Sequence, residues 1–194
     1  MPAPPRPLRP GTRRTSVRGV PQDGPVPTTE PVEGDDARVL ALTRALLDEM
    51  GERYRDDPGE IEPPHPDAAW LLLRDDAGHV VGCGAVQPLR TTLPDAPAEH
   101  GEIKRVYVDP AHRGRGHSRV LMDALVELAR GLGYTWLQLE TGTVQHEAVG
   151  LYRSSGWQPL PAYGQYAHDP RTVCFGLPLA PAAQAQGQTG VLGP

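Results

Sequence analysis

"VYVDPAHRGRGHSRVL", residues 106–121, begins like a strand, ends like a helix, and has two glycines and two arginines between them. A strand that enters a helix through a glycine loop directs several backbone N–H groups at one point, where the helix dipole adds partial positive charge. Gly114 and Gly116 allow the backbone to approach a ligand closely. Arg113 and Arg115 can add charge-assisted hydrogen bonds. The stretch therefore predicts an anion site, best suited to phosphate.

A glycine loop by itself is weak evidence for one particular ligand. This loop has no Lys-Ser/Thr pair, so it is not a P-loop, and it lacks the third glycine and the early position of a dinucleotide fingerprint. A tight turn with exposed arginines is the alternative interpretation. The segments on either side of the loop decide between the two.

Upstream of the loop, the sequence predicts one helix and a set of strands. Residues 35–54 form a helix, because Val39, Leu42, Leu46 and Met50 recur at helical spacing. Acidic residues at its start favour the positive end of the helix dipole.

The predicted strands before the loop include a hairpin. Residues 68–86 read as two strands joined by a turn at "DDAG", and residues 102–108 as the next strand. A short first strand is expected at residues 15–20, followed by a proline-rich link, and residues 55–67 are expected to form a loop.

Downstream of the loop, helices alternate with strands. The pattern predicts an amphipathic helix over 118–133, a strand over 134–140, a short helix from Gln145 that stops at Gly156, and a last strand over 172–179. This alternation favours an α/β layer over a helical bundle.

Composition narrows the function classes. The chain has 194 residues and a net charge of −5, which argues against a general nucleic-acid or anionic-membrane surface. It contains 18 arginines but only one lysine, Lys104, which we attribute to coding bias. Cys83 and Cys174 read as reduced core thiols, and the histidines show no metal-ligand spacing, so neither a disulfide nor a metal site is expected.

The ends of the chain differ from its middle. We expect a disordered Pro/Arg-rich tail over residues 1–12, one folded domain over 13–179 and a second disordered tail over 180–194. No apolar run approaches membrane-spanning length, so we expect a cytoplasmic protein.

Two segments resemble motifs of the GNAT superfamily, the acetyl-CoA-dependent N-acetyltransferases. Arg113 to Ser118 is similar to the coenzyme-A loop R/Q-x-x-G-x-G/A, with Ser118 where the family has Gly or Ala. Residues 145–157, "QHEAVGLYRSSGW", resemble the later segment N/Q-x-x-A-x-x-L-Y-x-x-x-G-F/W. The resemblance covers residues 101–179 well and the first half only through its order of elements.

The resemblance implies a GNAT-like α/β (α+β) fold. Its mixed, mostly antiparallel sheet would splay between the fourth strand (102–108) and the fifth (134–140), with helices on both faces. It also implies acetyl-CoA as the acyl donor, with its pantetheine arm in the gap. The pyrophosphate would lie on Arg113, Gly114, Arg115, Gly116, His117 and Ser118, the thioester near Val106, Tyr107 and Val108, and Gln145 would contact the arm.

Direct attack of an amine on the acetyl carbon is the implied reaction. Tyr152 matches the family tyrosine that supports the leaving thiolate, although packing in the core is its alternative role. Glu102 is the candidate to orient a water relay for the amine proton, because a carboxylate is a poor direct base for an ammonium. A charged residue at a strand edge is its alternative role.

The acceptor is expected to be a primary amine of a small molecule, near residues 55–67 and near Tyr163 and Tyr166. Four acidic residues of the loop could attract a cation, although a solvated loop explains them as well: Asp56, Asp57, Glu60 and Glu62. Transfer to a protein or peptide amine, a non-catalytic acyl-CoA sensor and a nucleotide-phosphate binder are the alternatives. No nucleic acid, membrane or metal is expected to take part, and a homodimer is left open.

Overall fold

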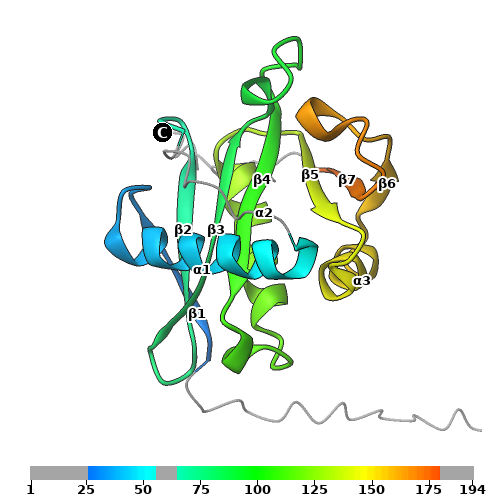
Figure 1. The fold of residues 1–194 in the computed structure, drawn as a ribbon. Coiled ribbons are helices and arrows are strands. Elements are labelled where there is room, and N and C mark those ends of the chain that lie inside the picture. The colour runs from blue at the N-terminus through cyan, green and yellow to red at the C-terminus, as the bar shows by residue number, and fades with distance from the viewer. Residues whose placement is uncertain (1–25, 56–64, 180–194) are drawn as a thin grey trace, which may run out of the picture.

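The computed structural model of the chain describes residues 26–55 and 65–179. A seven-stranded sheet with the order β1-β2-β3-β4-β5-β7-β6 forms its centre (Figure 1). The strands are β1 Thr28–Val32, β2 Ala69–Arg74, β3 Val80–Pro88, β4 His100–Val108, β5 Trp136–Gly142, β6 Gln158–Leu160 and β7 Thr172–Pro178. The α-helices are α1 Ala37–Tyr54, α2 His117–Gly131 and α3 His146–Ser154. The mixed, mostly antiparallel sheet is therefore confirmed.

The first strand differs from the prediction. The strand expected at residues 15–20 and both predicted tails lie outside the described residues. The prediction of a proline-rich link was wrong at Thr28–Val32, because this stretch forms a strand that pairs antiparallel with β2. β1 is the edge of the sheet. A proline such as Pro31 is tolerated on an edge strand, where one row of backbone groups has no neighbouring strand.

The remaining predicted elements agree with the structure within a few residues. The β2–β3 hairpin turns at residues 75–79, and Asp75 holds the turn by accepting backbone hydrogen bonds from Ala77 and His79. The side chain of Asp36 caps α1 by accepting from the backbone N–H of Arg38. β6 was not predicted, because it has only three residues and includes a proline.

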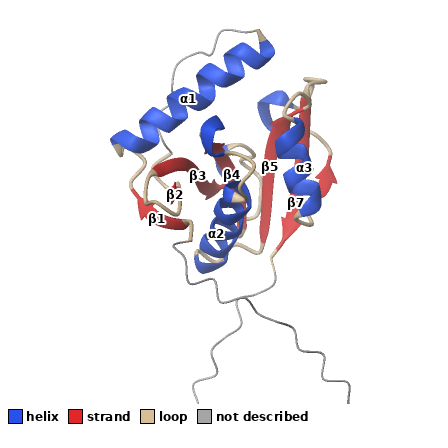
Figure 2. Ribbon diagram, turned by 90° about the horizontal axis from the view of Figure 1, so that it is seen from below, coloured by secondary structure: helices blue, strands red, loops and turns tan. Residues whose placement is uncertain are grey.

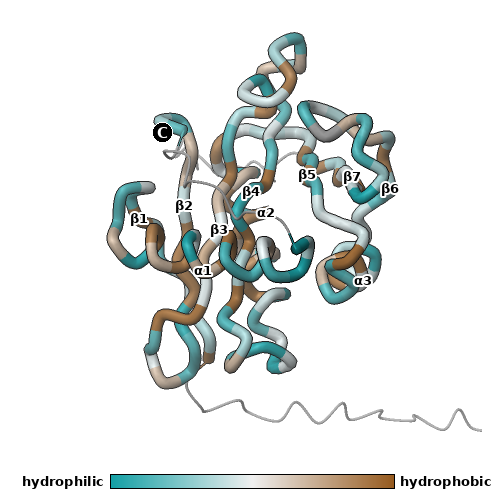
Figure 3. Tube along the Cα trace, in the orientation of Figure 1, coloured by the Kyte–Doolittle hydropathy of each residue, from teal (hydrophilic) through white to brown (hydrophobic). Residues whose placement is uncertain are grey.

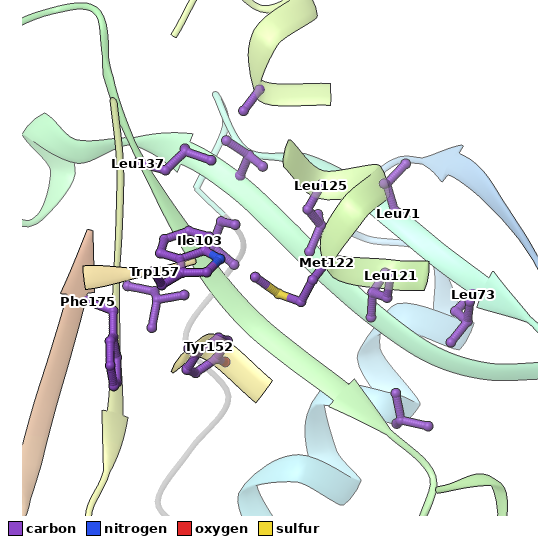
Figure 4. Packing of buried hydrophobic residues seen from close by; sticks show 14 of the residues in the cluster. Leu71, Leu73, Ile103, Leu121, Met122, Leu125, Leu137, Tyr152, Trp157 and Phe175 are labelled. Carbon is purple, nitrogen blue, oxygen red and sulfur yellow. The ribbon is translucent and has the colours of Figure 1, made fainter. Parts of the chain in front are cut away.

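The helices cover both faces of the sheet. Figure 2 shows α1 on one side and α2 on the other. Figure 3 shows hydrophobic residues along the central strands and mostly hydrophilic residues in the outer turns. Alternate residues of β2 therefore serve two cores: Trp70 and Leu72 pack under α1, whereas Leu71 and Leu73 pack against α2. The larger core also holds α3 through Tyr152 (Figure 4).

β4 and β5 separate partway along their length. They pair in parallel only from His100–Trp136 to Glu102–Gln138, while β5 continues to pair with β7 as far as Gly142. β4 also carries a bulge against β3, where Arg105 has a left-handed φ of 57°. A bulge and a left-handed non-glycine residue often mark functional sites. The splay after Glu102 confirms the expected gap.

Candidate active site

A cleft of ≈ 490 Å³ lies where β4 and β5 separate. Ile103 to Val106 of β4 and Leu139 to Gly142 of β5 form its walls, and the last three turns of α1 border it. Among the residues that the structure describes, this stretch of β4 has no strand partner on the β5 side, because the ladder ends at Glu102. An extended chain that carries amide groups can therefore bond to the free edge of β4 as an added strand.

Tyr152 lines this cleft from α3. Its ring packs 5.6 Å from that of Phe175 and 6.1 Å from that of Trp157, centroid to centroid, and only 6 % of the residue is exposed (Figure 4). Burial raises the pKa of Tyr152 to about 12, so its hydroxyl stays protonated at neutral pH. The residue is therefore both part of the core and part of the wall of the cleft.

Gln145 and Val106 also line the cleft. Tyr107 and Val108, which the sequence likewise predicted to contact the acetyl donor, do not line it. The side chain of Tyr107 packs under α1, and Val108 belongs to the core beneath α2. The part of β4 that borders the cleft thus begins earlier than the predicted stretch, at Ile103.

The glycine loop leads into α2 as the sequence predicted. Gly114 and Gly116 have left-handed φ values of 75° and 83°, and no atom of another described segment lies within 4 Å of where a Cβ would stand. The carbonyl of Gly116 accepts from the N–H groups of Arg119 and Val120. The two preceding N–H groups, of His117 and Ser118, stand before the first intrahelical acceptor and have no backbone partner within the described residues. This arrangement and the open space are suited to a phosphate group.

The two loop arginines have different roles. Arg113 donates to the carbonyl of Val108 and, through both terminal nitrogens, to Glu49 of α1 at 2.9 and 2.6 Å. Its guanidinium also lies 5.5 Å from the ring centre of Tyr107. Arg113 therefore ties the loop to α1, and its charge is already paired. Arg115 is exposed, so its guanidinium can reach an anion that approaches the loop.

His117 and Ser118 begin α2. His117 is 2 % exposed, and its Nδ1–H donates to the carbonyl of His112 at 2.8 Å, which fixes the end of the loop. Ser118 is half-buried. Within residues 26–55 and 65–179, no group of three or more potential ligands could hold a metal ion.

Glu102 is completely buried and surrounded by donors. Tyr163 donates to it at 3.0 Å, Thr92 at 2.5 Å and Gln87 at 3.1 Å, and the ammonium of Lys104 lies 3.5 Å away. The residue is absent from the walls of the cleft and of the neighbouring cavity. Within the described part of the chain, the carboxylate therefore contacts side chains that line the second cavity, such as Gln87 and Lys104, but lines neither cavity itself.

Glu140 is a residue that the sequence analysis missed. It lines both the cleft and a second cavity, and its Oε1 accepts from Lys104 at 3.0 Å. Burial alone lowers the pKa of Lys104, but Glu102 and Glu140 outweigh this and hold it above its usual value. The sequence held one signal for this ion pair, which is that Lys104 is the only lysine of the chain. Lysine supplies a compact charge that arginine does not, so a single lysine within a strand indicates a buried acidic partner.

Of the two segments expected near the acceptor, only single residues line a cavity among the described residues. His65 and Gln165, from the two predicted segments, line the second cavity. Tyr163 instead bonds to Glu102, and the side chain of Tyr166 is not described. The four acidic residues of the 55–67 loop lie outside the described residues. No helix of the described chain is long and apolar enough to cross a bilayer.

Comparison with known proteins agrees with this geometry. Over 143 residues the chain is 34% identical to an IAA acetyltransferase of Azospirillum brasilense, a match that covers 69% of this chain and 88% of that protein. A structure from Klebsiella pneumoniae assigned to the acyl-CoA N-acyltransferases superposes with a TM-score of 0.64 at 35% identity, covering 79% of this chain and 98% of that one.

A more distant structure shows the same fold. It comes from Salmonella typhimurium and contains its cofactor acetyl-CoA, with a TM-score of 0.55 at 18% identity over 81% of this chain and 96% of that one. Residues 39–157 match the Acetyltransferase (GNAT) family. The chain belongs to the GNAT family of acetyltransferases.

Proposed function

We propose that the protein transfers an acetyl group from acetyl-CoA to the primary amine of a small molecule. The observation that carries the proposal is the cleft between β4 and β5, which has a free strand edge on one wall and a protonated tyrosine on another. The second cavity, of ≈ 350 Å³, is within the usual size range for a small-molecule site.

The residues that bind the donor follow from this arrangement. The N–H groups of Gly114 to Ser118 and the side chain of Arg115 would bind the pyrophosphate. The β4 edge from Ile103 to Val106, with Gln145 opposite, would bind the pantetheine arm. Arg113 would act indirectly, by holding the loop against α1 through Glu49.

The chemistry needs a neutral amine and a stabilised leaving group. The amine nitrogen attacks the acetyl carbon, the C–N bond forms, the C–S bond breaks, and the amine proton passes to water. The donor, acetyl-CoA, would carry the acetyl group as an activated thioester. Backbone N–H groups of β4 polarise its carbonyl.

Tyr152 supports the developing thiolate by a hydrogen bond. A free thiol has a pKa of about 8.5, so full proton transfer from a tyrosine whose pKa is raised to about 12 is uphill by about 3.5 units. A hydrogen bond to the sulfur has no such cost, and water then protonates the thiolate. Glu102 is proposed to act through Lys104 and Tyr163, which it holds in place.

A thiol-release assay with acetyl-CoA and a panel of amines tests the function. Turnover with at least one amine is expected, and Tyr152→Phe should lower it. Binding of acetyl-CoA without turnover of any amine would favour the sensor alternative. A cytoplasmic location is part of the proposal, since Cys83 and Cys174 are free and buried. A homodimer is left open.

A further inference from the structure

The two walls of the cleft belong to strands that have come apart. The backbone ladder between β4 and β5 ends at Glu102, and the Lys104–Glu140 pair connects the strands just beyond that point. The β4 edge proposed to bind the donor lies on one wall, whereas Tyr152 stands on α3, which follows β5. The core beneath α2 holds the walls together from one face of the sheet. On the other face, their separation depends on what spans the gap.

The last turn of α1 spans this gap. The helix belongs to the β4 side, because Val39 in its first turn packs with side chains of β2, β3 and β4. Its other end lies beside α3 (Figure 1). There, Nη1 of Arg53 donates to Glu147 of α3 at 3.2 Å and to the carbonyl of Val144 at 3.5 Å. The helix is thereby attached to both walls.

Tyr54 makes a second contact across the gap. Its hydroxyl lies over Gly142 at the end of β5, so close that a Cβ on Gly142 would stand 1.3 Å from the hydroxyl oxygen. The guanidinium of Arg171, just before β7, lies 5.3 Å from the centre of the tyrosine ring. Because Tyr54 and Gly142 both line the cleft, this contact forms part of its wall.

Arg53 also continues a line of ion pairs that starts at the glycine loop. Glu49 accepts from Arg113 at 2.6 Å and from Arg53 at 2.9 Å, so Arg53 is held between two carboxylates, Glu49 and Glu147. The line runs from the loop proposed to bind the pyrophosphate, along α1, to the helix that carries Tyr152. Charges linked in a network hold their geometry better than an isolated surface pair does.

We infer that the last turn of α1 is a clasp that sets the separation of the two walls, and that Arg53 and Tyr54 are positioning residues for Tyr152. By holding α3 against α1, the clasp keeps the hydroxyl of Tyr152 within reach of the sulfur on the β4 edge. A displacement of about 1 Å is enough to lower a rate by about 100-fold. This inference rests on the proposed function and adds residues that act through Tyr152.

A double-mutant cycle tests whether Arg53 acts through Tyr152. In the thiol-release assay, Arg53→Met should lower kcat by about tenfold, because it removes the bonds to Val144 and Glu147. In the Tyr152→Phe background it should lower kcat little further, since the hydroxyl that it misplaces is already absent. Arg53→Lys keeps a cation for Glu147 and should recover part of the rate. An equal loss in both backgrounds, or no loss in either, would overturn the inference while leaving acetyl transfer intact.

Gly142→Ala opens the clasp from the opposite wall. The added methyl group displaces the ring of Tyr54, so kcat should fall as in Arg53→Met, and again only where Tyr152 is present. Arg38→Met is the matched control, because Arg38 lies at the other end of α1, pairs with Glu30 and Asp36, and lines neither cavity. It should keep the wild-type kcat. A loss as large as that of Arg53→Met would show that the effect does not belong to the clasp.

Distances between spin labels separate the inference from the proposed function. Glu52 of α1 and Gly150 of α3 are exposed, so Glu52→Cys and Gly150→Cys can carry labels while Cys83 and Cys174 stay buried. With Arg53 present the distribution of distances should be narrow, and Arg53→Met should broaden it. This result would support the clasp even if no amine released thiol and the proposed function failed. Identical distributions would overturn it.

Discussion

The ammonium of Lys104 lies 3.0 Å from Oε1 of Glu140, two residues beyond the last backbone pair between β4 and β5, Glu102–Gln138. The backbones of the two strands have separated at this level, yet side chains still connect them. Both residues line the cleft and the second cavity. The ion pair therefore stands where the acetyl donor and the acceptor are proposed to meet.

Loss of the Lys104 charge should destabilise the fold. In Lys104→Met the carboxylates of Glu102 and Glu140 lose their shared cation, and breaking a buried pair costs about 3 kcal/mol. We expect the free energy of urea unfolding to fall by about this amount. The control Arg130→Met breaks a surface pair with Glu127 and should cost less than about 1 kcal/mol. Adding Glu140→Gln to Lys104→Met should restore part of the lost unfolding free energy, because it removes one of the unpaired carboxylates. If the double variant instead lost the sum of the two single effects, Lys104 and Glu140 would not be energetically coupled.

Tyr152→Phe should lower kcat by a factor of about 100 with little change in acetyl-CoA binding, because the hydroxyl is proposed to act on the leaving sulfur. Since burial raises the pKa of Tyr152 to about 12, the hydroxyl is still protonated at pH 10. The ratio of wild-type to variant kcat should therefore be constant from pH 7 to 10. A ratio near one at every pH would remove Tyr152 from the proposed role.

Gly116→Ala should weaken binding of acetyl-CoA, measured by calorimetry, by about tenfold. Its φ of 83° strains any residue with a Cβ, and the added methyl group occupies the space proposed for phosphate. Gly78→Ala is a close control, because Gly78 has a φ of 84°, equally open surroundings and a place in the β2–β3 turn. Both variants should lose similar stability. Equal cofactor affinities would show that the loop does not hold the pyrophosphate.

The link between Glu49 and Arg113 should make stability depend on acidity. The hydrogen bonds from Arg113 outweigh desolvation and lower the pKa of Glu49 below 4.5. A lowered pKa stabilises the folded state above about pH 4.5, and this stability is lost as the pH falls through the folded value. Glu49→Gln should thus cost about 1 kcal/mol at pH 7 and progressively less below pH 4.5.

Thermal unfolding between pH 7 and 3 measures this difference. Glu52→Gln, on the same helix but exposed, should match the wild type at every pH. A Glu49→Gln deficit that persists unchanged at pH 3 would refute the charge-based link.

Glu102→Gln should affect folding more than chemistry. The amide would present N–H groups to Tyr163, Thr92 and Gln87, which already donate there, at a cost of about 3 kcal/mol. The unfolding free energy should fall, while acetyl-CoA affinity at low temperature should hold. A stable variant with strongly reduced kcat would instead place Glu102 in direct contact with the proton relay.

Local sequence determined much of the architecture. The 3.6-residue spacing of α1 and α2, the turn at "DDAG" and the glycine loop before α2 all depend on neighbours in the chain, so they were predictable. The motif around Tyr152 was readable only through its resemblance to the GNAT pattern. β1 and β6 were not, because each is short, contains a proline and exists only through its pairing with another strand.

The tertiary structure alone decided which side chains share a cavity. Glu102, Lys104 and Glu140 lie on two strands that diverge, so their contact depends on where the ladder stops. Trp70 and Lys104 both line the second cavity because of the cross-strand register of β2, β3 and β4. A slip of one residue in this register would turn these side chains to the other face of the sheet. Sequence spacing carries local geometry, whereas register and splay arise only when the whole sheet packs, and these two features shape the site.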